Sequence, residues 1–404
     1  MNPTRTSFLE DRIDFLAERY RDSVTEGNYF YETEMTGQTA ATVGTEGTDS
    51  IMLSSYSYLG LLRHPAIDAA ARAALEHYGT GTHGVRLLAG TTSAHRELER
   101  RIAEFKGTEA AVVFSTGYTA NVAAVSTLVG RHSVVICDKL NHASIVDACR
   151  LSGAEFLRFA HNDMEDLKRA LVQAGDRPAL VVVDGVFSMD GDIVTLPEIV
   201  DLAHEFGAAV MVDEAHSLGV LGETGHGVEE HFGLDPSAVD IKMGSLSKAI
   251  PASGGYIAGS RGLIDALKHN ARPYIFSSAL PPSVAAAAAA AFGVIEAEPE
   301  RVSDLRRKAV WFRDTLRAAG FRTGDSDTPI VPLLCGNETL TYEMTRLCRK
   351  NGVYVTPVVF PAVNKALPRL RLVVTAALDD DTLRRAVDVL IEAGRTCGLI
   401  EGAR

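Results

Sequence analysis

The stretch Ala208-Ala-Val-Met-Val-Asp213-Glu-Ala-His216 decides the fold class of this chain. Five apolar residues in a row end in an acid, which is typical of a strand that is buried on both faces of a sheet. Short apolar runs of the same kind recur between residues 60 and 280, at 111–114, 134–137, 180–184 and 255–258. Helical patterns separate these runs, so we predict an α/β domain with a mostly parallel sheet covered by helices.

The length of 404 residues exceeds one typical domain. We predict an N-terminal helix or arm over residues 1–59, a large α/β domain over 60–296 and a smaller α+β domain over 297–404. Apolar residues at helical spacing over 8–21 form the first helix, which packs either on a partner or on the main body.

Composition excludes several classes of partner. A formal charge of −12 and a pI near 5.5 argue against nucleic acid or an anionic membrane. The five cysteines contain no C-x-x-C pair, so we expect reduced thiols and no disulfide or metal framework. The N-terminus has no apolar run and no stretch is long enough to span a membrane, so we expect a cytoplasmic protein.

A second strand leads to a lysine, in Asp240-Ile-Lys-Met-Gly-Ser-Leu-Ser-Lys248. A lysine is usually a solvated surface charge, but this one follows a strand end and a hydroxyl-rich turn. Pyridoxal phosphate (PLP) needs an amine to hold its aldehyde as a Schiff base, a carboxylate at its ring nitrogen and donors for its phosphate. Lys248, Asp213 and Ser245 supply these groups, and ligands of such sheets sit at the carboxyl ends of strands. We therefore predict PLP as the cofactor.

Other strand ends carry residues suited to the same cofactor. Gly117 and Tyr118 open a helix after the strand at 111–114, where backbone N–H groups can bind phosphate. His216 follows Asp213 and can hydrogen-bond the 3-hydroxyl of the ring. His142 follows the strand at 134–137, where it either caps a helix or stacks on the face of the cofactor.

The motifs together identify a family. They are Ser57-Tyr-Leu-Gly-Leu61, Gly79-Thr-Gly-Thr-His-Gly-Val-Arg86, Phe114-Ser-Thr-Gly-Tyr118, Asn141-His-Ala-Ser144, Asp184-Gly-Val-Phe-Ser-Met-Asp-Gly191, Val212-Asp-Glu-Ala-His-Ser217 and Ser245-Leu-Ser-Lys248. In this order and spacing, the chain resembles the α-oxoamine synthase family of fold-type I PLP-dependent transferases (aspartate aminotransferase-like) over nearly its whole length. Segments 161–166 and 272–282 resemble the bacterial serine palmitoyltransferase branch.

The resemblance implies a decarboxylative Claisen-type condensation of an amino acid with an acyl thioester, carried by coenzyme A or an acyl carrier protein, to give an α-amino ketone. It implies Lys248, His142, Asp213 and His216 as catalytic residues. It places Ser188 near the 3-hydroxyl and Ser277 and Ser278 at the phosphate of a neighbouring subunit, hence a homodimer with shared active sites. Arg371 matches the arginine that holds the substrate carboxylate.

Two departures leave the amino acid open. Val85 stands where relatives carry serine or threonine, and Ser57 replaces the asparagine usual before Tyr-Leu-Gly. Both change polarity near the amino acid, and His83 has no assigned role. The alternatives are an 8-amino-7-oxononanoate synthase-like or glycine C-acetyltransferase-like activity and, in another class, a fold-type I aminotransferase.

Overall fold

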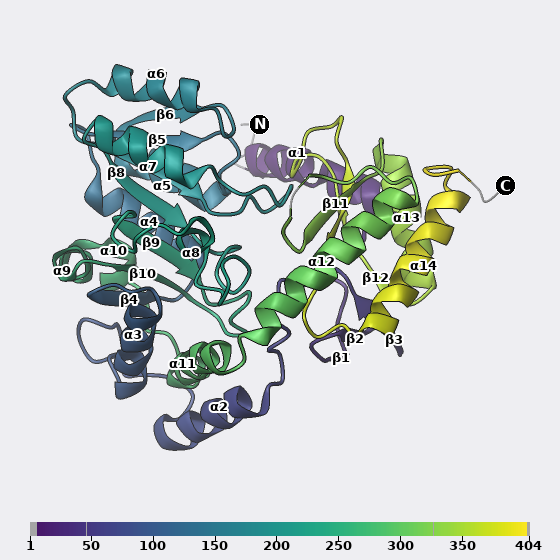
Figure 1. The fold of residues 1–404 in the computed structure, drawn as a ribbon, viewed down its shortest axis with the longest axis horizontal. Coiled ribbons are helices and arrows are strands. Elements are labelled where there is room, and N and C mark those ends of the chain that lie inside the picture. The colour runs from purple at the N-terminus through teal and green to yellow at the C-terminus, as the bar shows by residue number, and fades with distance from the viewer. Residues whose placement is uncertain (1–5, 46, 326, 402–404) are drawn as a thin grey trace.

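A computed structural model describes residues 6–45, 47–325 and 327–401 of the chain. Two lobes are visible in Figure 1, a large one built around a sheet with helices on both sides and a smaller one that holds the C-terminal helices. Helix α12 runs from the first lobe to the second.

The large lobe contains a seven-stranded sheet in which only β10 runs antiparallel to its neighbours. In spatial order the strands are β4 (Ala110–Phe114), β10 (Gly255–Gly259), β9 (Ile241–Ser245), β8 (Ala209–Asp213), β7 (Ala179–Asp184), β5 (Val134–Asp138) and β6 (Glu155–Phe159). The apolar runs read from the sequence are these strands, and the predicted fold class is confirmed. The strand order itself follows from no sequence pattern.

Side chains alternate between two cores, one on each face of this sheet. One core lies under α4 (Gly117–Leu128), α5 (Ala143–Ser152), α9 (Arg261–Asn270) and α10 (Arg272–Ile275). The other lies under α2 (Pro65–Tyr78), α3 (Ser93–Phe105), α6 (Met164–Ala174), α7 (Leu196–Glu205), α8 (Val228–Phe232) and α11 (Pro282–Ala297). Met211 belongs to the first core, and Asp213, two residues further on β8, therefore faces α4 and α5.

The smaller lobe combines C-terminal and N-terminal segments. One sheet has the order β11 (Ile330–Leu334), β14 (Arg369–Val373) and β13 (Pro357–Val358). A second joins β1 (Gly37–Gln38), β2 (Thr42–Thr45) and β3 (Thr48–Met52) to β12 (Val353–Tyr354). Helices α12 (Glu300–Ala318), α13 (Glu338–Lys350) and α14 (Asp380–Thr396) complete the lobe. Part of the predicted N-terminal segment thus pairs with this lobe, while the predicted domain boundaries stay a prediction.

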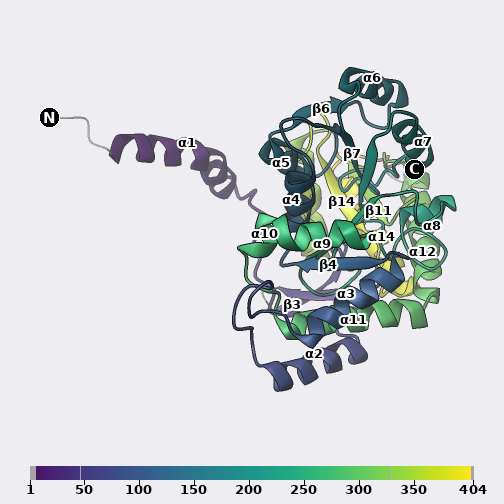
Figure 2. The same cartoon turned by 90° about the vertical axis from the view of Figure 1, so that its left-hand side faces the viewer.

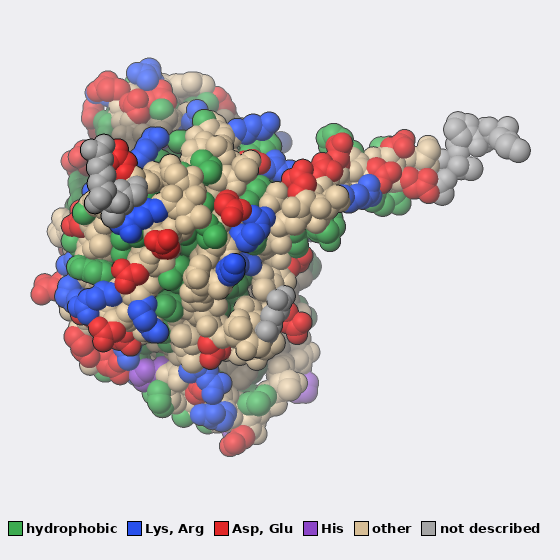
Figure 3. Space-filling view, turned by 90° about the vertical axis from the view of Figure 1, so that its right-hand side faces the viewer, with side chains coloured by type: hydrophobic (Ala, Val, Ile, Leu, Met, Phe, Trp, Pro, Cys, Tyr) green, Lys and Arg blue, Asp and Glu red, His purple; other side chains and the backbone are tan. Residues whose placement is uncertain are grey.

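The first helix, α1 (Thr6–Thr25), stands away from the body of the molecule (Figures 2 and 3). Its apolar side chains are exposed, with Phe8 at 76%, Phe15 at 67% and Leu16 at 61%. In an isolated chain these apolar side chains would be in contact with water. An exposed apolar stripe of this kind marks a surface suited to binding a partner. In the described part of the chain, no helix has both the length and the apolar character to cross a membrane.

Candidate active site

The predicted site residues gather where the parallel strands of the large sheet end. Asp184 ends β7, Asp213 ends β8 and Ser245 ends β9. His142 caps the N-terminus of α5, which follows β5. The carboxyl edge of such a sheet is where ligands bind, because the loops that follow the strands diverge there.

Lys248 lies in the turn after β9, with its amine inside the site. Its Nζ is 2.7 Å from Nε2 of His216 and 5.6 Å from the centre of the Tyr56 ring. Burial lowers the pKa of Lys248 to about 8, although Asp213 and Asp184 act in the opposite direction. A substantial fraction of the amine is therefore neutral near physiological pH, which a nucleophilic lysine requires.

His216 is held between Lys248 and a buried tyrosine. The hydroxyl of Tyr58 lies 2.6 Å from Nδ1 of His216, and Nη2 of Arg371 lies 3.4 Å from the same hydroxyl. Burial raises the pKa of Tyr58 to about 12, so the phenol keeps its proton. Burial, with the charges of Lys248 and Arg371, lowers the pKa of His216 well below its usual value. His216 is therefore a buried, neutral imidazole that lies between the phenol of Tyr58 at Nδ1 and the amine of Lys248 at Nε2.

Arg371 reaches this group from the smaller lobe. It lies on β14, is buried, and donates from Nε to the carbonyl of Ser188. Its guanidinium carbon is 4.8 Å from the centre of the Tyr56 ring, the ring that also contacts Lys248. The predicted carboxylate-binding arginine and the predicted cofactor-binding lysine thus lie at one ring, in a site that both lobes form.

Asp213 and Asp184 lie side by side at the ends of adjacent strands. Asp213 accepts hydrogen bonds from the amide of Asn121 at 2.8 Å and from the backbone N–H of Ala215 at 2.9 Å. Asp184 accepts from the backbone N–H of His142 at 2.7 Å. Burial and the neighbouring Asp213 raise the pKa of Asp184 well above its usual value. Two donors thus face the carboxylate of Asp213, and one faces that of Asp184.

The ring of His142 keeps an exposed surface, while its Nδ1 is 2.7 Å from the hydroxyl of Ser144. Desolvation by the surrounding protein lowers the pKa of His142. The result is a flat, neutral imidazole beside the carboxyl edge of the sheet, as a residue that stacks on a cofactor ring would need.

The first turn of α4 offers an anion-binding site. The Thr116 side chain accepts from the N–H of Thr119, so the N–H groups of Gly117 and Tyr118 are left for a ligand. A Cβ at Gly117 would lie 3.1 Å from the terminal methyl of Met243 and 3.5 Å from Oγ of Ser245, so the methionine side chain would have to shift to admit it. The hydroxyl of Ser245 is 2.9 Å from that of Ser247, and both can reorient to donate.

These residues fit PLP. The amine of Lys248 suits its aldehyde, the carboxylate of Asp213 its ring nitrogen, and the N-terminus of α4 with Ser245 its phosphate. A buried acceptor, Oδ1 of Asn121, has no hydrogen-bond partner within the described residues, as expected at the edge of a ligand site.

Other predicted residues lie outside this hydrogen-bonded group. Val85 and Ser278 form an isolated antiparallel bridge, and Ser277 adjoins it. No hydrogen bond in the described part of the chain links this pair to Lys248 or its neighbours. Ser57 is buried, and its hydroxyl has no partner among the described residues. The roles proposed for these four residues stay predictions.

Sequence reasoning missed several contributors, namely Tyr56, Tyr58, Asn121 and Ser144. Each of them lies within or beside a motif that predicted a different residue. No local pattern distinguishes these four residues from structural ones. Only their contacts in the folded chain reveal them, Tyr56 with Lys248, Tyr58 with His216, Asn121 with Asp213 and Ser144 with His142.

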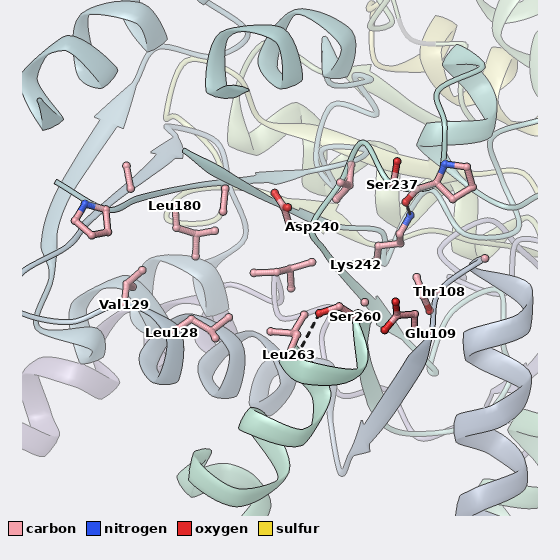
Figure 4. Close-up of a pocket in the computed structure, with 18 of the residues that line it drawn as sticks. Thr108, Glu109, Leu128, Val129, Leu180, Ser237, Asp240, Lys242, Ser260 and Leu263 are labelled. Carbon is pink, nitrogen blue, oxygen red and sulfur yellow. Dashed lines mark hydrogen bonds between the residues drawn. The ribbon is translucent and has the colours of Figure 1, made fainter. Parts of the chain in front are cut away.

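A separate cavity of about 710 Å³ lies at the opposite edge of the sheet (Figure 4). The amino ends of β7, β8 and β9 line it with Leu180, Ala209 and Ile241, and Leu128 and Leu263 close it from α4 and α9. None of the buried unpaired polar atoms of the described residues lies on its walls. The polar side chains on its walls that Figure 4 labels include Asp240, Lys242 and Ser260, and these three are engaged within the fold by Val210, Glu229 and Leu263.

Comparison with known proteins agrees with this geometry. A family model described as aminotransferase class I and II matches residues 48–390. The 8-amino-7-oxononanoate synthase of Thermoanaerobacter pseudethanolicus is 42% identical over 96% of this chain and 98% of that protein. The synthase of the same name from Symbiobacterium thermophilum is 45% identical over 88% and 91%. A serine palmitoyltransferase variant from S. paucimobilis, solved with a bound PLP-myriocin aldimine, superposes with a TM-score of 0.93 at 35% identity, over 96% and 99% of the two chains.

Proposed function

Since the chain belongs to the class I and II aminotransferase family, and within it to the α-oxoamine synthases, we propose that it condenses an amino acid with an acyl thioester. PLP is the cofactor, CO2 is lost and an α-amino ketone is the product. The observation that carries the proposal is the meeting of Lys248 and Arg371 at the Tyr56 ring. An amine-handling group and a carboxylate-binding group at one ring suit the two ends of an α-amino acid.

Bound PLP would supply an electron sink for the pair of electrons left when the α-proton of the amino acid is removed. Lys248 would hold the cofactor and, once displaced, take up that proton at its neutral Nζ. His216 would orient Nζ through the 2.7 Å contact with its Nε2. Arg371 would bind the substrate carboxylate with the end of its fork, since Nε is engaged by Ser188.

The remaining roles follow the same geometry. Asp213 would keep the ring nitrogen protonated, and His142 would cover one face of the ring. Gly117, Tyr118 and Ser245 would hold the phosphate, and Ser188 would lie near the 3-hydroxyl. We propose Ser57 and Val85 for the environment of the amino acid side chain.

The names of the relatives suggest two pairs of substrates, one for 8-amino-7-oxononanoate synthase and one for serine palmitoyltransferase. We favour the pair that gives 8-amino-7-oxononanoate. The curated relatives of that name are 42% and 45% identical, against 35% for the serine palmitoyltransferase structure. This reverses the order expected from segments 161–166 and 272–282. A nine-carbon acid with an 8-amino and a 7-oxo group is what this reaction gives from alanine and a seven-carbon acyl group that ends in a carboxylate. Serine with a long acyl chain is the second pair, favoured by the structural match.

The test is a substrate matrix on the purified holoenzyme. Alanine, serine and glycine are each combined with thioesters of a seven-carbon dicarboxylic acid and of palmitate, and thiol release, CO2 release and product mass are measured. We expect all three signals only with alanine and the dicarboxylic thioester. Keto acid formation without thiol release would instead identify an aminotransferase.

We also propose a homodimer. The projecting helix α1, with its exposed apolar side chains, supports it (Figure 3). Within the described residues, Ser278 pairs with Val85 and makes no hydrogen bond to the group around Lys248, which leaves it for the site of a second subunit. Light scattering should give twice the chain mass, and deletion of residues 1–25 should raise the dimer dissociation constant. The five free cysteines, four of them buried, are in keeping with a reducing compartment, and we propose the cytoplasm.

A further inference from the structure

A chain of hydrogen bonds joins Asp213 to His142 through two buried residues, Asn121 and Ser144. Nδ2 of Asn121 donates to Oδ2 of Asp213 at 2.8 Å and to Oγ of Ser144 at 2.9 Å. The hydroxyl of Ser144 lies 2.7 Å from Nδ1 of His142. Asn121 and Ser144 are each 1% exposed. The residue expected at the ring nitrogen of the cofactor and the one expected over its face are therefore linked.

The direction of each hydrogen bond in this chain is determined. A carboxylate only accepts, so the amide nitrogen of Asn121, and not its oxygen, faces Asp213. The second proton of that nitrogen goes to Ser144, whose oxygen accepts it. The hydroxyl proton of Ser144 is then directed to Nδ1 of His142. The backbone N–H of Ser144 points to the same nitrogen at 3.2 Å.

Because Nδ1 of His142 accepts two hydrogen bonds, from the hydroxyl and from the backbone N–H of Ser144, it carries no proton. His142 is then the neutral tautomer with its proton on Nε2. This state matters because the cofactor ring would carry a proton at its nitrogen. A neutral imidazole can lie against such a ring, whereas an imidazolium would bring two like charges together.

We propose that Asn121 and Ser144 are positioning residues that set Asp213 and His142 jointly for the cofactor. The amide of Asn121 orients the carboxylate, and the hydroxyl of Ser144 keeps Nδ1 of His142 an acceptor. The inference rests on the proposed function, since PLP is the group that Asp213 and His142 would contact. The lowered pKa of His142 agrees with it.

The unpaired oxygen of Asn121 supports a positioning role. A buried carbonyl without a partner destabilises the protein, and a side chain selected for packing alone would be apolar. An asparagine at position 121 has an amide nitrogen with two protons, and these donate to Asp213 and to Ser144 at the same time.

The experiment measures PLP binding to the apoenzyme and the visible absorption band of the bound cofactor. Ser144→Ala removes the hydroxyl donor to Nδ1 and leaves the longer contact from the backbone N–H, and we expect the PLP dissociation constant to rise about 3- to 10-fold with a displaced band. Ser144→Thr keeps the hydroxyl and should stay within about 2-fold of the wild type. Asn121→Asp replaces the donor by an acceptor next to a carboxylate, and we expect a rise of about 10- to 100-fold.

A background variant isolates the link to His142. His142→Phe keeps a flat ring but has no acceptor, so adding Ser144→Ala to it should change PLP affinity no further. Ser126→Ala is the matched control, because Ser126 lies on the same α4 helix as Asn121 and its hydroxyl bonds, among the described residues, only the carbonyl of Val122. It should leave affinity and spectrum unchanged.

A lower melting temperature for Ser144→Ala with unchanged affinity and band would overturn the inference and leave the proposed function intact. An equal effect of Ser144→Ala with and without His142 would do the same. A wild type that binds no PLP would overturn the proposed function itself. If Asn121→Asp does not fold, the Ser144 and His142 variants decide the question alone.

Discussion

Replacing Arg371 with lysine tests the carboxylate site most directly. Lysine keeps the positive charge but offers a compact ammonium on a flexible chain in place of a planar fork. In the structure Nε of Arg371 is taken by the carbonyl of Ser188, and Nη2 lies 3.4 Å from the Tyr58 hydroxyl. The end of the fork remains for two parallel hydrogen bonds to a substrate carboxylate.

The expected loss of affinity for the amino acid follows from the number of hydrogen bonds that each side chain can donate to the carboxylate. A lysine ammonium at the same place can make one charge-assisted hydrogen bond where the fork makes two, and each such bond contributes about 1.5–3 kcal/mol. At about 1.4 kcal/mol per factor of ten, the dissociation constant of the amino acid should rise roughly 10- to 150-fold.

The assay titrates the holoenzyme with the amino acid and follows the cofactor absorbance. The same titration with a primary amine that has the same side chain but no carboxylate should give equal constants for wild type and Arg371→Lys. Arg384→Lys, on the exposed face of α14, is the matched control and should bind both ligands normally. If Arg371→Lys weakens the amine as much as the amino acid, or weakens neither, Arg371 does not bind the carboxylate.

Three further predictions concern single residues. Lys248→Ala should abolish the visible band that borohydride traps in the wild type, while a colourless wild type would contradict covalent cofactor binding. His161 is held by two carboxylates, and although burial alone would lower its pKa, their hydrogen bonds raise it to about 9. The stabilisation from the protonated His161 is therefore complete below about pH 6.5 and is lost as the pH rises towards 9. Urea unfolding should show the stability difference between wild type and His161→Gln shrinking by about 3 kcal/mol between pH 6 and 10. A stability difference that does not change with pH would refute this. Lys242→Met removes the ammonium that lies 2.6 Å from both carboxylate oxygens of the buried Glu229. The free energy of unfolding should fall by about 3–5 kcal/mol. A fall of less than about 1 kcal/mol would show that Glu229 is neutral.

Much of the large lobe could be predicted because its signals are local. A continuous apolar run that ends in an acid predicts a buried strand from local sequence alone, and Asp213 follows such a run directly. Lys248, Gly117 and His142 likewise stand just past strand ends. Their residue types and places along the chain were enough to predict the cofactor, and the motif order was enough to predict the family.

The N-terminal segment shows where such reasoning stops. Residues 37–52 have weak strand character. Strands β1, β2 and β3 pair with one another in this segment, and the end of β3, Ile51 and Met52, joins the smaller lobe by pairing with Val353 and Tyr354. A pairing partner three hundred residues away leaves no periodic trace in either segment, since a short strand gains its stability from the neighbour and not from its own sequence.

The sequence by itself determined the chemistry of this protein, because amine, acid and imidazole are properties of residue types and strand ends are properties of local patterns. Only the tertiary structure decided which residues control those groups. Tyr58 meets His216 and Arg371 because the smaller lobe closes on the carboxyl edge of the sheet. Asn121 meets Asp213 because α4 packs over β10 and β9, the strands that lie between β4 and β8 in the sheet. Hydrogen bonds near 3 Å between distant segments depend on strand order and lobe packing, and no spacing along the chain encodes either.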